Sequence, residues 1–334
     1  MVNAGPLSTR LTRLFGIEHP VLGGGLMWLS DARYVSALSH AGCMGFITTR
    51  SFATETALRQ ELQRCGELAQ GRPFGVNLTL SARQQANAGI RPALDLALEM
   101  GVRHFETAGN APRALIDAIH AAGAVVIHKV TSLRHGLAAQ EAGADAIAFV
   151  GMEEGGHPGA NELPTMLLGA LARERIHIPW VLGGGIGHGS QLAAALALGA
   201  QGVLMGSRLL VCEEISAHRA YKEHLAGCDE HSTVRVLQSL GNTWRVLRNG
   251  TTAQVQALER AGASDHAAFG ELLGSQAARA CYQNGDWQQG MLSLGPAIAF
   301  ATRILPLKLI VEQFLQETQT ALERIAHLAP PHHA

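Results

Sequence analysis

The chain has 334 residues, of which 47% are hydrophobic and 16% are charged, and its formal net charge at pH 7 is −1. This length and composition can bury a large core, and the near-neutral charge excludes the strongly basic surfaces that bind nucleic acid or anionic membranes. The expected partners are small molecules, or a second copy of the chain, so that a monomer or a homodimer is predicted.

The five cysteines are scattered and form no CxxC pair, so neither a structural zinc site nor a disulfide framework is expected. The N-terminal residues have no apolar stretch of signal-peptide type, and no uninterrupted apolar run reaches the ~18 residues of a membrane span. These features predict a cytoplasmic protein in a reducing compartment.

A helix-to-strand junction recurs along the first two-thirds of the chain. At each junction a helical pattern ends in a small residue and a glycine, and a short apolar run follows. Glycine suits the left-handed residue that ends a helix, and short apolar runs are typical of buried parallel strands. Eight strands are predicted, at about residues 19–25, 44–49, 73–80, 104–109, 124–131, 145–151, 179–185 and 202–207. Helices are predicted at about residues 30–41, 53–69, 90–100, 112–122, 132–142, 165–174 and 189–198.

Eight alternating strand and helix units favour an α/β fold of the (β/α)8 TIM-barrel type, predicted for residues 1–210. A doubly wound sheet would place one glycine-rich turn after its first strand, whereas here glycine clusters recur at several strand ends. From residue 211 the apolar residues follow helical spacing only, which predicts an α-helical cap subdomain over 211–328 that closes the pocket. Part of the barrel's closure is expected from this C-terminal segment, and residues 329–334 are expected to be a disordered tail.

Polar residues end three of the inner predicted strands. Asn77, at the end of the third strand, either hydrogen-bonds a heterocyclic ring or caps the segment that follows. Glu106, at the end of the fourth, is a candidate substrate contact, with a salt bridge behind the site as the alternative. Lys129, near the end of the fifth, serves as a cation beside a flavin ring, forms a Schiff base or reaches solvent.

The first predicted strand delivers a glycine run to the expected mouth of the barrel. Gly23–Gly25 and the following Leu26 permit close backbone contact with a flat cofactor. Met27 and Trp28 come next and are candidate substrate contacts, with packing in the core as the alternative.

The loop after the sixth predicted strand carries the leading candidate for catalysis. An apolar run ends in Glu153 and Glu154, a glycine pair that includes Gly156, and His157. A histidine can act as a general base at neutral pH, and either glutamate can orient it or raise its pKa. The alternative is a loop histidine without a chemical role. A metal site is not expected, because the spacing matches no familiar ligand pattern and the cluster holds a single histidine.

The glycines after the seventh and eighth predicted strands indicate a phosphate site. Gly183, Gly184 and Gly185 end one strand, and Gly206 and Ser207 end the next. In TIM-barrel enzymes backbone N–H groups at this strand pair commonly hold a phosphate, and the Ser207 hydroxyl can add a donor. The alternative is that these glycines only make tight turns. A sugar phosphate, a nucleotide and FMN all remain possible ligands.

Several segments together resemble the nitronate monooxygenase family, formerly called 2-nitropropane dioxygenases, and most of all its branch of bacterial NADH:quinone reductases. The segments are EHPVLGGGLMW, PFGVNLTL, HFETAGN, VIHKVTSLRHG, GADAIAFVGMEEGGHPG, GGGIGHGSQLAAALALGAQGVLMGSR and SLGNTWRVLRN, and the resemblance covers about residues 8–326. It implies a flavin-dependent (β/α)8 barrel with an α-helical cap, in which His157 is the active-site histidine. The implied cofactor residues, with their neighbours in the same motifs, are Gly23, Gly24, Gly25, Leu26, Asn77, Lys129, Gly156, Gly183, Gly184, Gly185, Gly206 and Ser207.

The sequence departs from the family's pattern at three positions. Gly23 stands where the quinone-reductase branch tends to have glutamine, Ser207 replaces a threonine, and Glu154 stands where relatives usually carry a small residue. Glu154 would place a negative charge beside the flavin, which counts against a nitronate anion as the substrate.

The resemblance implies an FMN-dependent oxidoreductase that oxidises alkyl nitronates with O₂, with His157 as the base. Glu154 and Lys129 are further candidate catalytic residues from their positions at strand ends. The alternative is an NAD(P)H:quinone or enone reductase that uses the same FMN site, with NADH or NADPH as electron donor. A lyase that uses Lys129 to form a Schiff base is a third and weaker hypothesis. The physiological substrate, the electron donor and the oligomeric state are left open.

Overall fold

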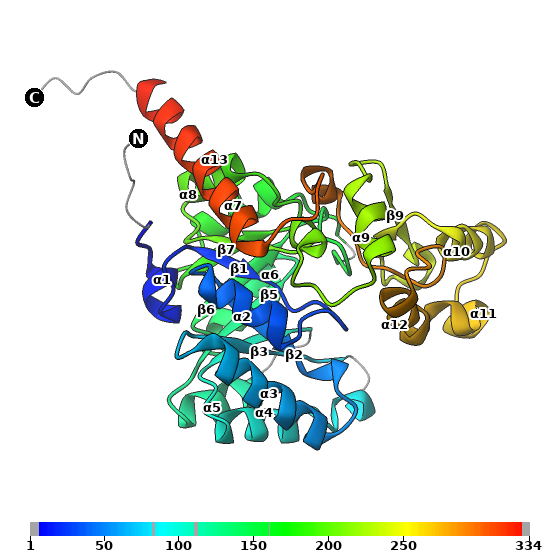
Figure 1. The fold of residues 1–334 in the computed structure, drawn as a ribbon, viewed down its shortest axis with the longest axis horizontal. Helices are drawn as coiled ribbons and strands as arrows, with labels where there is room; N and C mark the ends of the chain where they lie inside the picture. Colours follow the sequence, from blue (N-terminus) through cyan, green and yellow to red (C-terminus); the bar gives the residue numbers. More distant parts are fainter. Residues whose placement is uncertain (1–6, 82–83, 110–112, 160, 329–334) are drawn as a thin grey trace, which may run out of the picture.

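The computed structural model describes residues 7–81, 84–109, 113–159 and 161–328, and the expected disordered tail lies outside this range. A closed barrel of eight parallel strands, hydrogen-bonded in the order β1 to β8, forms its centre, and β8 pairs back with β1 (Figure 1). The predicted TIM-barrel fold is confirmed. The strands are β1 (Val21–Gly23), β2 (Met44–Thr48), β3 (Gly75–Thr79), β4 (His104–Ala108), β5 (Val125–Val130), β6 (Ala146–Val150), β7 (Trp180–Gly183) and β8 (Val203–Met205).

Helices that cover the barrel lie where the sequence predicts them. The glycines at the helix-to-strand junctions all have positive φ, as expected for residues that end helices. These glycines are Gly42, Gly101, Gly123, Gly143 and Gly199. The helices are α2 (Ala32–His40), α3 (Glu55–Ala69), α4 (Ile90–Glu99), α5 (Arg113–Ala121), α6 (Leu133–Glu141), α7 (Thr165–Arg173) and α8 (Gly189–Leu198).

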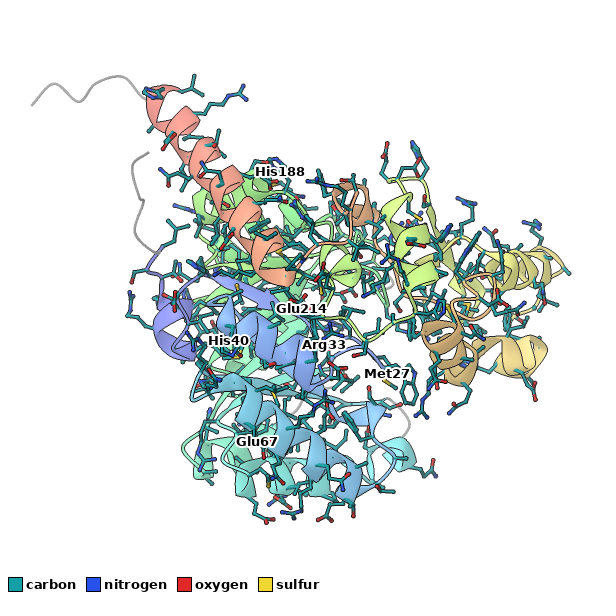
Figure 2. All side chains as sticks on the ribbon, viewed as in Figure 1. Met27, Arg33, His40, Glu67, His188 and Glu214 are labelled. Carbon is teal, nitrogen blue, oxygen red and sulfur yellow. The ribbon has the colours of Figure 1, made fainter. Side chains whose placement is uncertain are left out.

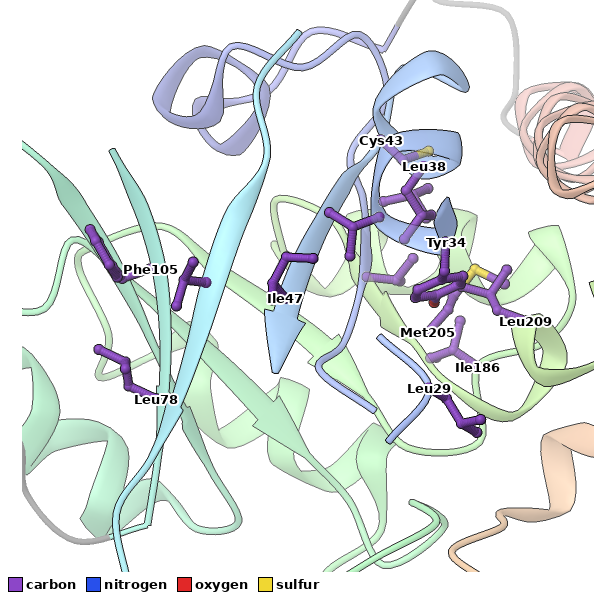
Figure 3. Close-up of a cluster of buried hydrophobic side chains, with 14 of the residues drawn as sticks. Leu29, Tyr34, Leu38, Cys43, Ile47, Leu78, Phe105, Ile186, Met205 and Leu209 are labelled. Atoms are coloured by element: carbon purple, nitrogen blue, oxygen red, sulfur yellow. The ribbon is translucent and has the colours of Figure 1, made fainter. Parts of the chain in front are cut away.

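The core has one layer between the barrel and its helices and another inside the barrel. Figure 3 shows part of the outer layer, where Tyr34 and Leu38 of α2 lie near Ile47 of β2 and Met205 of β8. The inner layer is built by the alternate, inward-facing residues of the strands. Its members include Leu22, Met44, Phe46, Ile127, Ala148, Val181 and Leu204.

A short helix that the sequence analysis did not predict, α1 (Arg10–Phe15), closes one end of the barrel. Its Phe15 belongs to the inner layer of the core, and its ring centroid lies 6.3 Å from that of Phe46. The same ring lies 5.5 Å from His104, the first residue of β4. Because α1 covers the amino ends of the strands, the carboxyl ends are left for a site.

The last helix, α13 (Leu307–Leu328), packs along α8 and against α2 (Figure 1). Its buried face consists of Leu307, Ile310, Val311, Phe314 and Thr318. This helix lies within residues 211–328, which are predicted to form the cap, but its contacts with α8 and α2 make it part of the barrel's outer layer. The C-terminal segment thus contributes to the barrel, as predicted.

The cap lies between η3 (Ser207–Val211) and α13 and is not wholly helical. Its helices are α9 (Arg219–Ala226), α10 (Gly250–Arg260), α11 (His266–Phe269) and α12 (Ser275–Asn284). The prediction of helices alone is wrong, because β9 (Thr233–Val236) and β10 (Trp244–Leu247) pair as an antiparallel hairpin. Thr, Val and Trp favour strands, and the hairpin buries its valines with Phe269 in a small separate core.

Short 3-10 helices connect these elements. In the described part of the chain, no helix is both long enough and apolar enough to cross a membrane. The 3-10 helices are η1 (Thr49–Ser51), η2 (Gln84–Asn87), η3 (Ser207–Val211), η4 (Gln238–Leu240), η5 (Gly270–Leu273) and η6 (Pro296–Phe300).

Candidate active site

A polar cluster lies on three neighbouring strands, with Asn77 and Glu106 in the middle of β3 and β4, and not at their ends as predicted, and Lys129 near the carboxyl end of β5. Asn77 pairs with Glu106 in the register of β3 and β4, so the two side chains meet. Glu106 Oε2 accepts hydrogen bonds from the Asn77 amide and, at 3.3 Å, from the backbone N–H of Gly25. The Lys129 ammonium lies 3.8 Å from Glu106 Oε1. One carboxylate thus holds an amide, a cation and the β1 turn in a fixed arrangement.

Glu106 acts behind the site and does not line it. The prediction that it contacts the substrate is wrong, because its side chain is 0% exposed. Its burial is tolerable because it is paired with Lys129 and hydrogen-bonded. The alternative of a salt bridge behind the site is the one that the structure bears out.

Lys129 and Glu154 perturb each other's titration. Burial alone lowers the pKa of the Lys129 ammonium, but the carboxylates of Glu106 and Glu154 outweigh it, so that the pKa is raised. Burial raises the pKa of Glu154 to about 8, with Lys129 opposing this shift and Glu106 adding to it. At neutral pH the ammonium is therefore charged and most Glu154 side chains are protonated.

His157 is held by the cap hairpin. Its Nδ1 lies 3.2 Å from the carbonyl oxygen of Thr243, and its ring centroid lies 4.8 Å from that of Trp244. The loop also pairs with β10, because the Gly156 N–H donates to the Arg245 carbonyl at 3.0 Å and the Arg245 N–H donates to the Gly156 carbonyl at 2.7 Å. The cap therefore fixes both the backbone and the ring of the predicted base.

The contact with Thr243 decides which ring nitrogen is free. A carbonyl oxygen can only accept, so Nδ1 carries the proton of the neutral ring and Nε2 keeps its lone pair. The imidazole is exposed, yet the surrounding loop and cap displace much of its water. This burial lowers the pKa of His157, and backbone hydrogen bonding to Thr243 and Asn242 offsets only part of the effect. At pH 7 the ring is neutral and Nε2 can accept a proton.

Glu153 has a structural role at the start of α7. Its carboxylate accepts from the Thr165 N–H at 3.1 Å and from the Thr165 hydroxyl at 2.9 Å. A carboxylate there satisfies a free N–H and suits the positive end of the helix. The prediction that Glu153 or Glu154 orients His157 is wrong, because Thr243 does so. Sequence reasoning missed Thr243 because it lies 86 residues away, in a segment predicted to be helical.

Close packing accounts for two glycines of the β1 turn. A Cβ on Gly25 would lie 2.8 Å from the Asn77 side chain, so glycine lets this backbone reach the polar cluster. A Cβ on Gly23 would lie 2.3 Å from Leu38 and 2.9 Å from Tyr34 of α2, so glycine brings this strand close to α2. At Gly24 the nearest atom would be 3.4 Å away, which is ordinary contact.

The end of the same turn connects the barrel to the cap. Trp28 has a φ of 68°, which is rare for a bulky residue, and its N–H donates to Ser51 Oγ at 2.8 Å. The Arg279 guanidinium of α12 lies 4.8 Å from the centroid of the Trp28 ring. Met27 is 40% exposed, and Figure 2 shows it on the side of the barrel toward the cap. The role of both side chains in binding a substrate stays a prediction.

The glycines after β7 and β8 present unpaired backbone donors. In the described residues, the N–H groups of Gly185, Gly206 and Ser207 have no protein acceptor. A Cβ on Gly206 would have its nearest neighbour 3.9 Å away, so there is room beside this backbone. Ser207 Oγ accepts from the Gly295 N–H at 2.8 Å, which leaves the hydroxyl hydrogen free to donate. Such donors suit the oxygens of a phosphate.

The two preceding glycines are explained by packing. A Cβ on Gly183 would lie 2.8 Å from Val150, and one on Gly184, whose φ is 88°, would lie 2.9 Å from the backbone of Gly151. Their contact with a cofactor stays a prediction, as it does for Leu26 and Gly156. In the part of the chain that the structure describes, no group of three or more His, Cys, Asp or Glu side chains is arranged to hold a metal ion.

Comparisons with known proteins agree with this arrangement. The nitronate monooxygenase family model matches residues 8–317. The chain is 34% identical to the (3aS,4S,5R,7aS)-5-hydroxy-7a-methyl-1-oxo-octahydro-1H-indene-4-carboxyl-CoA dehydrogenase of Mycobacterium tuberculosis, over 76% of this chain and 70% of that protein. It is 30% identical to the nitronate monooxygenase of Pseudomonas aeruginosa, over 73% of this chain and 80% of that protein.

Solved structures give the same picture. The structure of FabK from Thermotoga maritima superposes with a TM-score of 0.87 at 30% identity, covering 97% of this chain and 100% of that chain. The nitroalkane oxidase of Streptomyces ansochromogenes superposes with a TM-score of 0.79 at 26% identity, covering 94% of this chain and 99% of that chain. Because the family match spans nearly the whole chain, the protein belongs to the nitronate monooxygenase family and is an oxidoreductase.

Proposed function

We propose that the protein is an FMN-dependent oxidoreductase that oxidises alkyl nitronates, and the nitroalkanes from which they form, with O₂. The observation that carries this proposal is a neutral His157 with a free Nε2, in the loop after β6, in the same barrel as the Lys129–Glu106 pair of the neighbouring strands β4 and β5. A base for a carbon-bound proton and a partly buried cation suit such an oxidation. Flavin dependence is typical of the family, which supports FMN as the cofactor.

The residues of the site fit a bound FMN. The free N–H groups of Gly185, Gly206 and Ser207 would hold its phosphate, and the glycines of the β1 turn would allow its ring close to the backbone. Lys129 would stand by the ring as a cation that favours its negatively charged reduced form. Bound FMN would supply the redox chemistry, taking electrons from the substrate and passing them to O₂.

His157 would remove the proton from the carbon next to the nitro group. The proton moves to Nε2, and the imidazolium that forms is stabilised by the Thr243 carbonyl, which already accepts the Nδ1 hydrogen. Trp244 packs against the ring and limits its rotation. A positioned general base of this kind contributes about 10²- to 10⁴-fold in rate.

Glu154 is compatible with an anionic substrate at neutral pH. The sequence suggests a negative charge beside the cofactor, but burial raises the pKa of Glu154 to about 8. A protonated carboxyl group can instead donate a hydrogen bond to a nitronate oxygen. The electrostatic objection to a nitronate therefore applies only above about pH 8.

The proton on Glu154 also favours a second candidate, an NAD(P)H-dependent reductase of quinones or enones. Such a reaction needs a proton donor, and a carboxyl group with a pKa of about 8 beside a cation can serve. The likeness to proteins named as carboxyl-CoA dehydrogenases supports a substrate other than a nitronate. The Schiff-base lyase is disfavoured, because the raised pKa of Lys129 keeps its amine protonated and unable to attack.

Oxygen uptake and anaerobic reduction distinguish the two candidates. With ethylnitronate in air, the purified protein is expected to consume O₂ far faster than the same concentration of free FMN. Mixed anaerobically with NADH or NADPH, it is expected to keep its flavin absorbance at about 450 nm. Rapid bleaching by a nicotinamide with no nitronate turnover would assign the second candidate, and a protein that binds no flavin would contradict both.

A further inference from the structure

The segment 185–189, which leads from β7 into the first residue of α8 and is called the β7–α8 turn below, is held by a side chain of α8. Gln191 Oε1 accepts from the N–H groups of Gly187 at 2.7 Å and His188 at 2.9 Å. Gln191 Nε2 donates to the Gly185 carbonyl at 2.8 Å. This turn begins at Gly185, one of the free donors proposed to hold the phosphate, so whatever fixes the turn also places that donor.

Side chains of α13 form a second set of contacts with this turn. Glu317 Oε2 accepts from the Gly189 N–H at 2.7 Å. The Thr318 hydroxyl lies 3.1 Å from the Gly189 carbonyl oxygen and shares its hydrogen with the Phe314 carbonyl at 2.8 Å, so its contact with Gly189 is the weaker one. His188 Nε2 lies 3.8 Å from Glu317, and Figure 2 shows His188 near α13. A Cβ on Gly189 would lie 2.1 Å from the Phe314 carbonyl oxygen, so helix and turn are in direct contact.

Arg208 links these contacts to the other half of the proposed phosphate site, the segment after β8. It follows Ser207 directly and is buried, its Nη1 donates to the Gly187 carbonyl, and the same atom lies 3.4 Å from Glu317 Oε2. Glu317 therefore contacts the turn after β7 through Gly189 and the segment after β8 through Arg208. A single carboxylate ties the two halves of the site together.

The backbone N–H groups at the start of α8 are already hydrogen-bonded within the protein. The Gly189 N–H binds Glu317, the Ser190 N–H binds His188 Nδ1 at 3.2 Å, and the Gln191 N–H binds the His188 carbonyl at 2.9 Å. An anion at the usual place, the N-terminus of the helix, would find these donors occupied. A phosphate here must rely on donors on either side of the turn, whose relative placement then matters.

We propose that Glu317 is a positioning residue for the phosphate of the bound cofactor, acting through Gly189 and Arg208 to set the spacing between Gly185 and Gly206–Ser207. This inference rests on the proposed FMN dependence. The role is geometric: the negative charge of Glu317 is compensated by Arg208, and the essential feature is an oxygen that accepts from the Gly189 N–H. Glutamine at this position keeps such an oxygen, whereas alanine does not.

The test compares FMN with riboflavin, which lacks only the phosphate. The full-length protein, freed of flavin by dialysis, is titrated with each compound while flavin fluorescence is followed. Glu317→Ala is expected to weaken FMN binding about 10-fold while changing riboflavin binding less than about 3-fold, the size expected when a contact to a charged group is lost. Glu317→Gln is expected to restore FMN affinity to within about 3-fold of the parent.

Two further variants test the same role in a second residue and provide a control. Thr318→Val is nearly isosteric and removes a milder contact with Gly189, so it is expected to lower the ratio of FMN to riboflavin affinity by about 3-fold even if Glu317→Ala folds poorly. Glu312→Gln is the control, because Glu312 lies on the same helix and pairs only with exposed Lys308 among the described residues. It is expected to leave both affinities unchanged.

The outcomes separate the inference from the proposed function. Equal losses of FMN and riboflavin affinity in Glu317→Ala and Thr318→Val would mean that α13 merely supports the fold, and the inference would be overturned while FMN dependence stands. A Glu317→Gln variant as weak as Glu317→Ala would overturn the geometric role. A parent protein that binds neither flavin would overturn the proposed function itself.

Discussion

Replacing Glu154 with glutamine isolates the electrostatics of the site from its chemistry. The pKa of Glu154 is raised from the ordinary 4.5 to about 8, chiefly by burial. The folded state therefore holds this proton more tightly than the unfolded state does. The contribution of this shifted pKa to the stability of the folded state is complete below about pH 4.5 and is lost as the pH rises to about 8. Glutamine is neutral at every pH and does not incur this loss.

The magnitude follows from the shift. At about 1.4 kcal/mol for each pH unit, the full difference would approach 5 kcal/mol, and the partial exposure of the side chain reduces it to about 2–3 kcal/mol. The Glu154→Gln variant is thus expected to match the parent within about 1 kcal/mol at pH 5 and to exceed its free energy of unfolding by about 2–3 kcal/mol at pH 9.

Urea unfolding of both proteins at several pH values, with the cofactor content matched by absorbance, measures this difference. Glu141→Gln is the control, because Glu141 is exposed at the end of α6, and its substitution is expected to have no pH-dependent effect. If the gain from Glu154→Gln were the same at pH 5 and pH 9, Glu154 would not be a partly buried carboxyl group with a raised pKa, and the reasoning would be refuted.

Three further outcomes are expected. With an anionic nitronate, kcat/KM falls above about pH 8 in the parent as Glu154 ionises, and the Glu154→Gln profile lacks this limb; an unchanged limb would assign it to another group. Lys129→Met removes the cation that lowers the pKa of Glu154, so the same limb moves to higher pH, and a shift to lower pH would contradict the coupling. Gly184→Ala introduces a side chain at a φ of 88° and 2.9 Å from the Gly151 backbone, so urea unfolding should reveal a loss of about 2–4 kcal/mol; a loss below about 0.5 kcal/mol would contradict the close packing.

The barrel was predictable because each of its units repeats the same local physics. A glycine such as Gly143 ends a helix, and a short apolar run such as Ala146–Val150 has no polar face and must be buried on both sides. These signals lie within a few residues of each other, so one sequence is enough to find them. The glycine clusters then marked the strand ends at which the site lies.

The cap hairpin was missed because its strands are short. Thr233–Val236 and Trp244–Leu247 have four residues each, and such brief alternation also fits helical spacing when the neighbouring segments are helical. The hairpin gains its stability from packing with Phe269 and from the pairing of Arg245 with Gly156 of the loop after β6. Both are long-range contacts, which a single sequence does not reveal. Because the hairpin was not predicted, the Thr243 carbonyl that orients His157 was not predicted either.

The identity of the polar residues was predictable, but their roles were not. Asn77, Glu106 and Lys129 are recognisable as polar residues of the predicted strands, yet whether Glu106 faces a ligand or lies behind one depends on the register of β3 and β4. The state of Glu154 depends on burial and on distances to two residues of other strands. Charge alone suggested an anion there, whereas burial makes a neutral acid.

The most direct test of the account compares nitroethane and ethylnitronate as substrates for the parent protein and for His157→Asn, by oxygen uptake at pH 7. A general base is needed for the neutral nitroalkane and not for the preformed nitronate. His157→Asn is expected to lose about 10²-fold or more of the nitroethane activity and to retain most of the ethylnitronate activity. Equal turnover of nitroethane by the two proteins would contradict the role of His157 as the base.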